Sequence, residues 1–168
     1  MNEQAVSILI AAGEPAGRRS LVKTLAGAGY SRIAAVASGP EALAAMEKEA
    51  FAIVIAEARL AGMTGYDLCR AIRDRRAAAY VYVLILARGK RKSLVLKGLA
   101  AGADATLPLP ADPAELTACV GAARRITDLE RALRLTNEEV RALSIRDPLT
   151  GVFNRVYLME RLPQEFKR

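Results

Sequence analysis

Short apolar runs alternate with amphipathic segments along the first two thirds of the chain. The runs are short and include β-branched residues, which favours strands buried on both faces. Between the runs, apolar residues recur at helical spacing, as in Tyr66, Leu68, Cys69 and Ile72. The predicted strands are Val6 to Ala11, Ile33 to Ala37, Phe51 to Ala56, Tyr80 to Ala87 and Ala105 to Leu107.

Glycine and proline mark the ends of the intervening helices. Glycines stop a helix that begins at Arg18 and reaches Ala28, and Pro40 lies in the first turn of a helix that runs to about Lys48. Another helix is predicted from Ser93 to Ala101. Strands alternating with helices predict an α/β fold, a doubly wound five-stranded parallel sheet in the order 2-1-3-4-5 with helices on both faces.

The residue pattern after the fifth predicted strand predicts one long helix from Asp112 to about Leu143. Apolar residues in it alternate at spacings of three and four, which is a heptad seam. The helix could pack along its own domain, but at nearly 50 Å it would be longer than a small domain can cover. We therefore expect a parallel homodimer. The seam residues are Ile126, Leu133 and Val140 at position a, with Leu129, Thr136 and Leu143 at position d.

The composition of the chain argues against several classes of protein function. The chain has 168 residues, 52% of them hydrophobic, and its two cysteines are expected in the core. No basic region precedes the first apolar run and no stretch approaches the roughly 18–20 residues of a membrane span, so we expect a cytoplasmic protein without membrane contact. The absence of histidine excludes phosphohistidine chemistry within the chain.

The net charge of +7 is concentrated between Arg70 and Lys97. A basic cluster can bind nucleic acid or an acidic partner. No recognition-helix pattern accompanies these charges. A solvated helix face and loop is therefore the favoured interpretation, and nucleic acid is not the expected partner.

A carboxylate follows the third predicted strand. Glu57 stands at its carboxyl end, where open α/β sheets place their chemistry, and a glycine-containing loop leads into the next helix. This stretch resembles a response-regulator receiver domain, in which an aspartate there accepts a phosphoryl group and a loop of roughly M-P-G-M-D-G follows. The loop here is Leu60-Ala61-Gly62-Met63-Thr64-Gly65, and the resemblance covers roughly Ser7 to Gly121.

Several positions depart from the receiver pattern. Mg²⁺ usually needs one or two carboxylates besides a phosphate. The resemblance implies that the metal-binding acidic pair falls on Ala12 and Gly13, the phosphoacceptor on Glu57, the hydroxyl residue on Ala87, the switching aromatic on Thr106 and the lysine on Leu109. We therefore expect a degenerate pseudo-receiver, without bound metal and without phosphorylation at Glu57.

Glu57 itself has two interpretations. It could mimic part of the phosphorylated state, although it carries about −1 charge against roughly −2 for a phosphate. Alternatively, it is a carboxylate at a solvated strand end, paired with Arg59 or Arg88. We expect Arg88 to occupy the space of the missing lysine, because it follows directly on Ala87.

A second resemblance lies near the end of the chain. The segment RDPLTGVFNR is similar to the opening of a GGDEF, or diguanylate cyclase, domain, D-x-L-T-G-L-x-N-R. The matching residues are Asp147, Leu149, Thr150, Gly151, Asn154 and Arg155. The resemblance implies that Asn154 helps to hold a guanine base. The GGDEF signature itself is absent, so we expect an N-terminal fragment of a longer cyclase, with Mg²⁺ and GTP as cofactors of the full-length protein only.

These features predict three parts: a receiver-like domain over residues 1–111, a helical coiled-coil linker over 112–146, and a truncated GGDEF start over 147–168. The leading hypothesis is a non-enzymatic module that dimerises, responds to an upstream signalling protein and regulates an attached diguanylate cyclase. One alternative is an active receiver in a two-component phosphorelay, with Glu57 at the phosphoacceptor position. Another is a nucleic-acid-binding protein, which a steep salt dependence of oligonucleotide binding would reveal.

Overall fold

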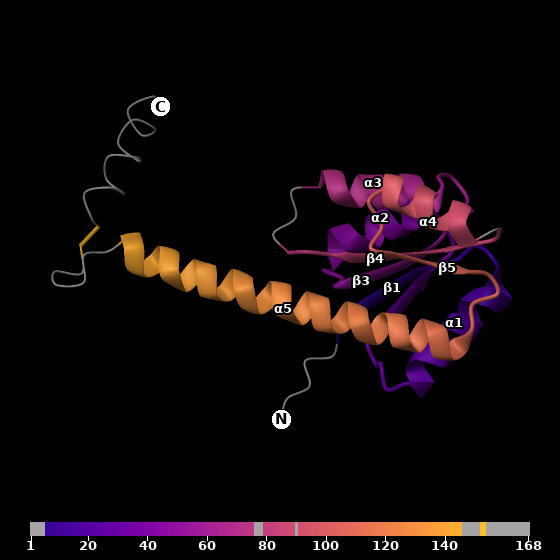
Figure 1. Ribbon diagram of the computed structural model, residues 1–168, viewed down its shortest axis with the longest axis horizontal. Helices are drawn as coiled ribbons and strands as arrows, with labels where there is room; N and C mark the ends of the chain where they lie inside the picture. Colours follow the sequence, from indigo (N-terminus) through magenta and orange to yellow (C-terminus); the bar gives the residue numbers. More distant parts are fainter. Residues whose placement is uncertain (1–5, 76–78, 90, 146–151, 154–168) are drawn as a thin grey trace. The chain divides into compact units, whose positions relative to one another are not determined.

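The computed structural model describes residues 6–75, 79–89, 91–145 and 152–153 (Figure 1). It contains two compact units, Met1–Asp128 and Leu129–Arg168, whose boundary falls within the last helix. The elements are β1 (Ile8–Ala11), α1 (Pro15–Gly27), β2 (Ile33–Val36), α2 (Gly39–Lys48), β3 (Ile53–Glu57), α3 (Gly65–Asp74), β4 (Tyr82–Ala87), α4 (Arg91–Ala100), β5 (Ala105–Pro108) and α5 (Pro113–Ile145).

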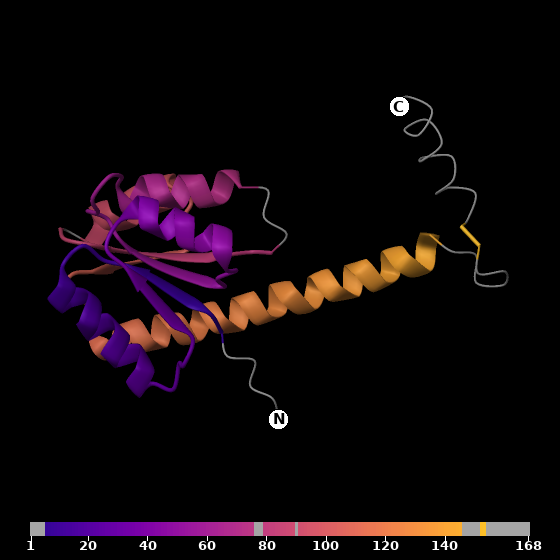
Figure 2. The same cartoon turned by 180° about the vertical axis from the view of Figure 1, so that it is seen from behind.

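The strands form one parallel sheet in the order β2-β1-β3-β4-β5, which confirms the predicted fold. Successive side chains of a strand point to opposite faces, so the sheet supports two cores. Ile8 and Ile10 pack with residues of α1 and α5, whereas Leu9 and Ala11 pack with residues of α2, α3 and α4. Figures 1 and 2 show these helices as two layers with the sheet between them.

Element ends differ from the prediction by a few residues. We predicted that Val6, Phe51 and Tyr80 begin strands, but each lies just before the strand that it was expected to start. At Phe51 the reason is that an apolar side chain can be buried before sheet pairing starts. Phe51 is only 6% exposed. Helix α1 begins at Pro15 rather than at Arg18, since proline is well suited to the first helical position.

A dense polar network joins the amino ends of β4 and β5. Arg73, near the end of α3, places its Nη2 2.6 Å from Asp104 Oδ2 and donates through Nη1 to the Val81 carbonyl oxygen at 2.6 Å. Asp104 also accepts the Val83 N–H at 2.6 Å and the hydroxyl of Tyr80. One carboxylate therefore links a helix and two neighbouring strands.

Helix α5 buries one stripe of side chains, formed by Leu116, Val120, Ala123 and Thr127. Each side chain from Asp128 to Val140 is exposed. Among the residues that the structure describes, no helix is long and apolar enough to cross a membrane.

Both cysteines are free thiols in or beside the core. Cys69, a residue of α3, is fully buried, and Cys119 is partly buried on α5. Burial raises the pKa of both thiols, which disfavours the reactive thiolate. This agrees with their interpretation as small core residues.

Candidate functional site

The candidate site lies at the carboxyl edge of the sheet. Ala12 comes directly after β1, and Glu57 is the last residue of the neighbouring strand β3. Ala87 ends β4, and Leu109, just after β5, donates its N–H to the Ala87 carbonyl oxygen at 2.9 Å. Four positions singled out in the sequence therefore meet at one edge, and three of them carry apolar side chains.

The carboxylate of Glu57 is bound by the backbone of the chain. Its Oε2 accepts the Gly13 N–H at 3.1 Å. A Cβ built at Gly17 would lie 3.7 Å from Glu57 Oε1, so the first turn of α1 lies close to this second carboxylate oxygen. Glu57 therefore ties the end of β3 to the loop between β1 and α1.

The guanidinium of Arg18 also binds this loop. Arg18 of α1 donates through Nη1 to the carbonyl oxygen of Ala12 at 2.6 Å and to that of Gly13 at 3.4 Å. Gly13 thus holds the Glu57 carboxylate through its N–H and a cation through its carbonyl. Sequence reasoning missed this role of Arg18, whose only signal was its position in the first helix after the predicted β1 turn.

Close backbone packing fixes the loop that follows Glu57. A Cβ built at Gly65 would lie 2.3 Å from the Glu57 carbonyl oxygen, so only glycine fits there without a shift of the chain. A Cβ built at Gly39, where α2 begins, would lie 2.1 Å from Cγ of Met63. The loop is therefore packed between the end of β3 and the start of α2.

Two nearby carboxylates are engaged in capping helices. Glu41 accepts the Ala37 N–H at 3.1 Å and the Ser38 hydroxyl at 2.9 Å, and these bonds lower its pKa. Asp67 forms a capping box with Thr64 at the start of α3, and the Thr64 hydroxyl bond is the main cause of its lowered pKa. Both side chains therefore stabilise helix starts at this edge.

The residues present do not fit the Mg²⁺ ion that the receiver resemblance implies. Ala12 and Gly13 offer no side-chain oxygen. In the described parts of the chain, no group of three or more histidine, cysteine or acidic side chains could hold a metal ion. A single carboxylate, already bonded to Gly13, falls short of the oxygen-rich octahedral set that Mg²⁺ requires.

The expected arginine partners of Glu57 do not reach it. Arg59 and Arg88 are both exposed, and no ion pair among the described residues joins either of them to Glu57. The carboxylate instead uses the Gly13 amide. Leu109 packs against the core that includes residues of α5.

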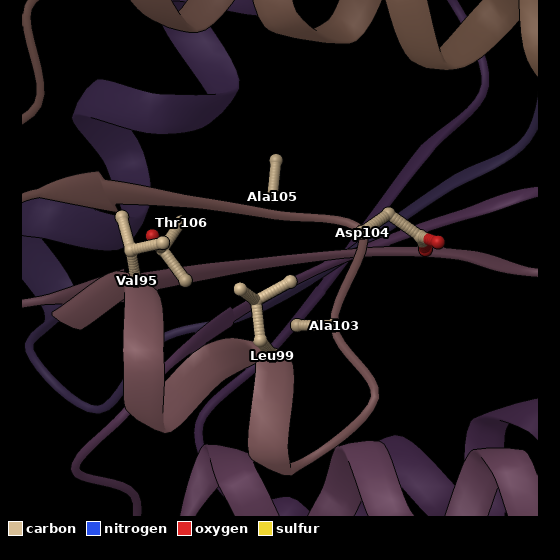
Figure 3. A pocket seen from close by; sticks show the side chains of 6 residues that line it. All are labelled: Val95, Leu99, Ala103, Asp104, Ala105 and Thr106. Carbon is tan, nitrogen blue, oxygen red and sulfur yellow. The ribbon is translucent and has the colours of Figure 1, made fainter.

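Thr106 faces α4 rather than Glu57. A Cβ built at Gly98 of α4 would lie 2.2 Å from the Thr106 methyl group. A hollow of about 190 Å³ lies here. In Figure 3 the Asp104 carboxylate points away from Val95 and Leu99. The other lining residues are Ala103 and Ala105. This mostly apolar lining holds no group of side chains suited to catalysis.

The remaining predicted residues belong to the C-terminal part of the chain. Of the seam residues, Ile126, Leu129, Leu133 and Val140 are exposed, and the Thr136 hydroxyl donates to a carbonyl within the same helix. The side chain of Leu143 lies outside the described part of the structure. So do the matched residues of the second resemblance, Asp147, Leu149, Thr150, Gly151, Asn154 and Arg155.

Known proteins with similar sequences are bacterial response regulators. The chain is 31% identical over 140 residues to the DNA-binding response regulator MtrA of Mycolicibacterium smegmatis, covering 83% of this chain and 60% of MtrA. It is 29% identical over 116 residues to the transcriptional regulatory protein YvrH of Bacillus subtilis, covering 69% of this chain and 48% of YvrH. The chain therefore spans only part of the length of these relatives.

Solved structures agree with this similarity. The chemotaxis response regulator CheY4 of Vibrio cholerae has a TM-score of 0.66 and 26% identity, covering 71% of this chain and 99% of that one. The response regulator DrrB of Thermotoga maritima has a TM-score of 0.62 and 26% identity, covering 70% of this chain and 51% of that one. Residues 8–121 match the model of the response regulator receiver domain. The chain therefore belongs to the response regulator receiver family of two-component signalling.

Proposed function

We propose that this receiver transmits a signal without being phosphorylated, with Glu57 as a permanent carboxylate at the phosphoacceptor position. The observation that carries the proposal is the bond between Glu57 and the Gly13 amide, at an edge where Ala12, Ala87 and Leu109 supply no polar side chain. Glu57 serves here as a structural link between β3 and the first loop.

The chemistry of phosphoryl transfer supports this proposal. Negative charge on the transferred group must be met by metal ions or cationic side chains placed in advance. The two acidic positions and the lysine position of the receiver pattern are occupied by Ala12, Gly13 and Leu109. Arg18 binds the same loop as Glu57, but its guanidinium is bonded to two backbone carbonyl groups.

Incubation with acetyl phosphate and Mg²⁺, followed by intact-mass measurement, tests the proposal. We expect no added phosphoryl mass, whereas a receiver with the complete acidic pair and aspartate should gain it in the same mixture. A stoichiometric gain in mass that disappears in Glu57→Ala would overturn the proposal. It would establish the second candidate function, an active phosphoacceptor receiver, which the similarity to response regulators favours.

For the output, we propose a diguanylate cyclase attached after the long helix, answering an upstream signalling protein. The support is the run of matches from Asp147 to Arg155 to the opening of that domain. MtrA is described as a DNA-binding response regulator, which makes a DNA-binding output the competing proposal. The coding sequence downstream of Arg168 decides between them. A G-G-[DE]-E-F signature and synthesis of cyclic di-GMP from GTP by the full product are expected, and a DNA-binding domain there would overturn the cyclase.

A further inference from the structure

Helix α5 carries a second apolar stripe besides the buried one. Ile126 is 40% exposed, Leu129 71%, Leu133 59% and Val140 58%. Large apolar side chains in water are a source of association when they line up along one element. Each side chain from Asp128 to Val140 is exposed, so this stripe lies at the surface of the chain.

The exposed stripe is distinct from the buried one. The buried stripe ends at Thr127, whereas the exposed stripe starts at its neighbour Ile126. Successive residues of an α-helix differ by about 100° around its axis. Ile126 therefore points in a different direction from Thr127, and the exposed stripe follows another line along the helix than the buried one.

The exposed stripe has the register of a two-stranded coiled coil. Ile126, Leu133 and Val140 fall at position a, and Leu129 and Thr136 fall at d, a pattern in which β-branched residues at a favour parallel pairs. Thr136 donates its hydroxyl to the Ala132 carbonyl oxygen at 3.1 Å. Its polar group is thus satisfied within its own helix and requires nothing from a partner.

The charges on α5 fit a second copy of the same helix. Two ion pairs within the helix, Arg124–Asp128 and Arg134–Glu138, occupy positions b, c and f, away from the seam. Position g holds Arg125, and the following e position holds Glu130. In a parallel, in-register pair these two side chains approach each other across the chains with opposite charge.

We infer that α5 pairs with α5 of a second copy of this chain, parallel and in register, through the seam from Ile126 to Val140. The paired stretch would be about 21 Å long at 1.5 Å per residue. The inference is independent of the proposed function, since it holds whether or not Glu57 accepts a phosphoryl group.

Sedimentation equilibrium of the whole chain tests the pairing. We expect a dimer that Leu133→Asp weakens by about a hundredfold or more, because a charge would be buried at position a. The matched control is Leu135→Asp, since Leu135 is also a leucine on the same helix and is 47% exposed, but lies at position c, outside the seam. It should leave the dimer nearly unchanged. A monomeric wild type at high micromolar concentration would overturn the inference, and so would an equal effect of the two substitutions.

Disulfide cross-linking tests the orientation. In a parallel pair, the two copies of position 129 face each other, so Leu129→Cys should form a covalent dimer under mild oxidation, whereas Leu135→Cys should not. The wild type, with its native Cys69 and Cys119, gives the background. Preferential cross-linking of Leu129→Cys to Val140→Cys in a mixture of the two variants would instead show an antiparallel pair and overturn the inference. Circular dichroism confirms that each variant remains folded.

Discussion

The carboxylates at the two ends of the sheet differ in how many groups they bind. At the amino end, Asp104 accepts bonds from Arg73, Val83 and Tyr80, and the aromatic ring of Tyr80 lies 5.3 Å from the Arg73 guanidinium carbon. At the carboxyl end, the Glu57 carboxylate accepts a bond from the Gly13 amide. The dense network therefore lies away from the edge where open α/β folds place their chemistry.

This difference separates fold maintenance from signalling chemistry. The side chains of Arg73 and Asp104 are 27% and 19% exposed, so their charges are largely withdrawn from water and need each other. At the carboxyl end, small or apolar residues stand where a phosphorylated receiver needs oxygen ligands and a cation. On the proposed function, the sheet keeps the receiver architecture without the groups for phosphoryl transfer at its carboxyl edge.

The largest effect is expected at the amino end. Asp104→Ala leaves the Arg73 guanidinium without its counter-ion and the Val83 N–H without an acceptor, and should lower the free energy of unfolding by about 3 kcal/mol. Denaturant unfolding followed by circular dichroism measures it. The control is Glu49→Ala, which removes the ion pair with Arg32, whose side chains are 55% and 49% exposed for Arg32 and Glu49. That exposed pair should contribute about 0.5 kcal/mol or less.

If Asp104→Ala lowers the free energy of unfolding no more than Glu49→Ala does, the amino-end network does not stabilise the fold. The comparison of the two ends would then be wrong. A further check is Tyr80→Phe. It removes the hydroxyl bond to Asp104 while keeping the ring near Arg73, and should cost about 1 kcal/mol.

The sequence predicted the positions of the site better than its contacts. Ala12, Glu57 and Ala87 could be placed at one edge, because parallel strands end together and each position follows a recognisable apolar run. The bond from Gly13 to Glu57 and the role of Arg18 could not be predicted, since they depend on the path of a loop and on the rotamers of long side chains. The placement of Arg88 in the space of the missing lysine stays a prediction.

The fold was predictable because burial repeats along the chain. Runs such as Val54 to Ala56 are buried on both faces, and that burial produces the pattern from which strands were inferred. The Asp104 network was not predicted, because its members are scattered between Arg73 and Asp104 and no periodicity connects them. Strand ends shifted by one to two residues where apolar side chains are buried outside the sheet, as at Phe51.

An intermediate effect is expected from backbone packing at the carboxyl end. Gly65→Ala would place a Cβ 2.3 Å from the Glu57 carbonyl oxygen and 3.2 Å from the Ala58 Cα. Because both neighbours are backbone atoms, the loop must move, and stability should fall by about 2 kcal/mol. Gly27→Ala is the control: a Cβ there meets nothing within 4 Å, so it should be neutral or stabilise α1 by up to about 1 kcal/mol.

Equal stabilities for Gly65→Ala and Gly27→Ala, measured by denaturant unfolding, would show that the loop after β3 is not tightly fixed. The carboxyl end would then be the deformable end of the sheet, and the description of Glu57 as a rigid link would be wrong.

The smallest expected effect is on the pH dependence of stability. It identifies which carboxylates at the carboxyl end contribute to that dependence. The pKa of Glu41 and that of Asp67 are lowered in the folded chain, from ordinary values of 4.5 and 3.8, by the bonds that cap α2 and α3. A depressed folded pKa means that these bonds stabilise the fold fully above the ordinary values, and that the stabilisation is lost as the pH falls through the folded pKa. Unfolding midpoints of the wild type should therefore decline as the pH falls from about 5 towards 3.

The variants Glu41→Gln and Asp67→Asn test this origin. Their unfolding midpoints should be lower than that of the wild type at neutral pH and should decline less over that range, because the neutral side chains have no charge to lose. If both variants kept the full acid dependence of the wild type, the caps would not be its source.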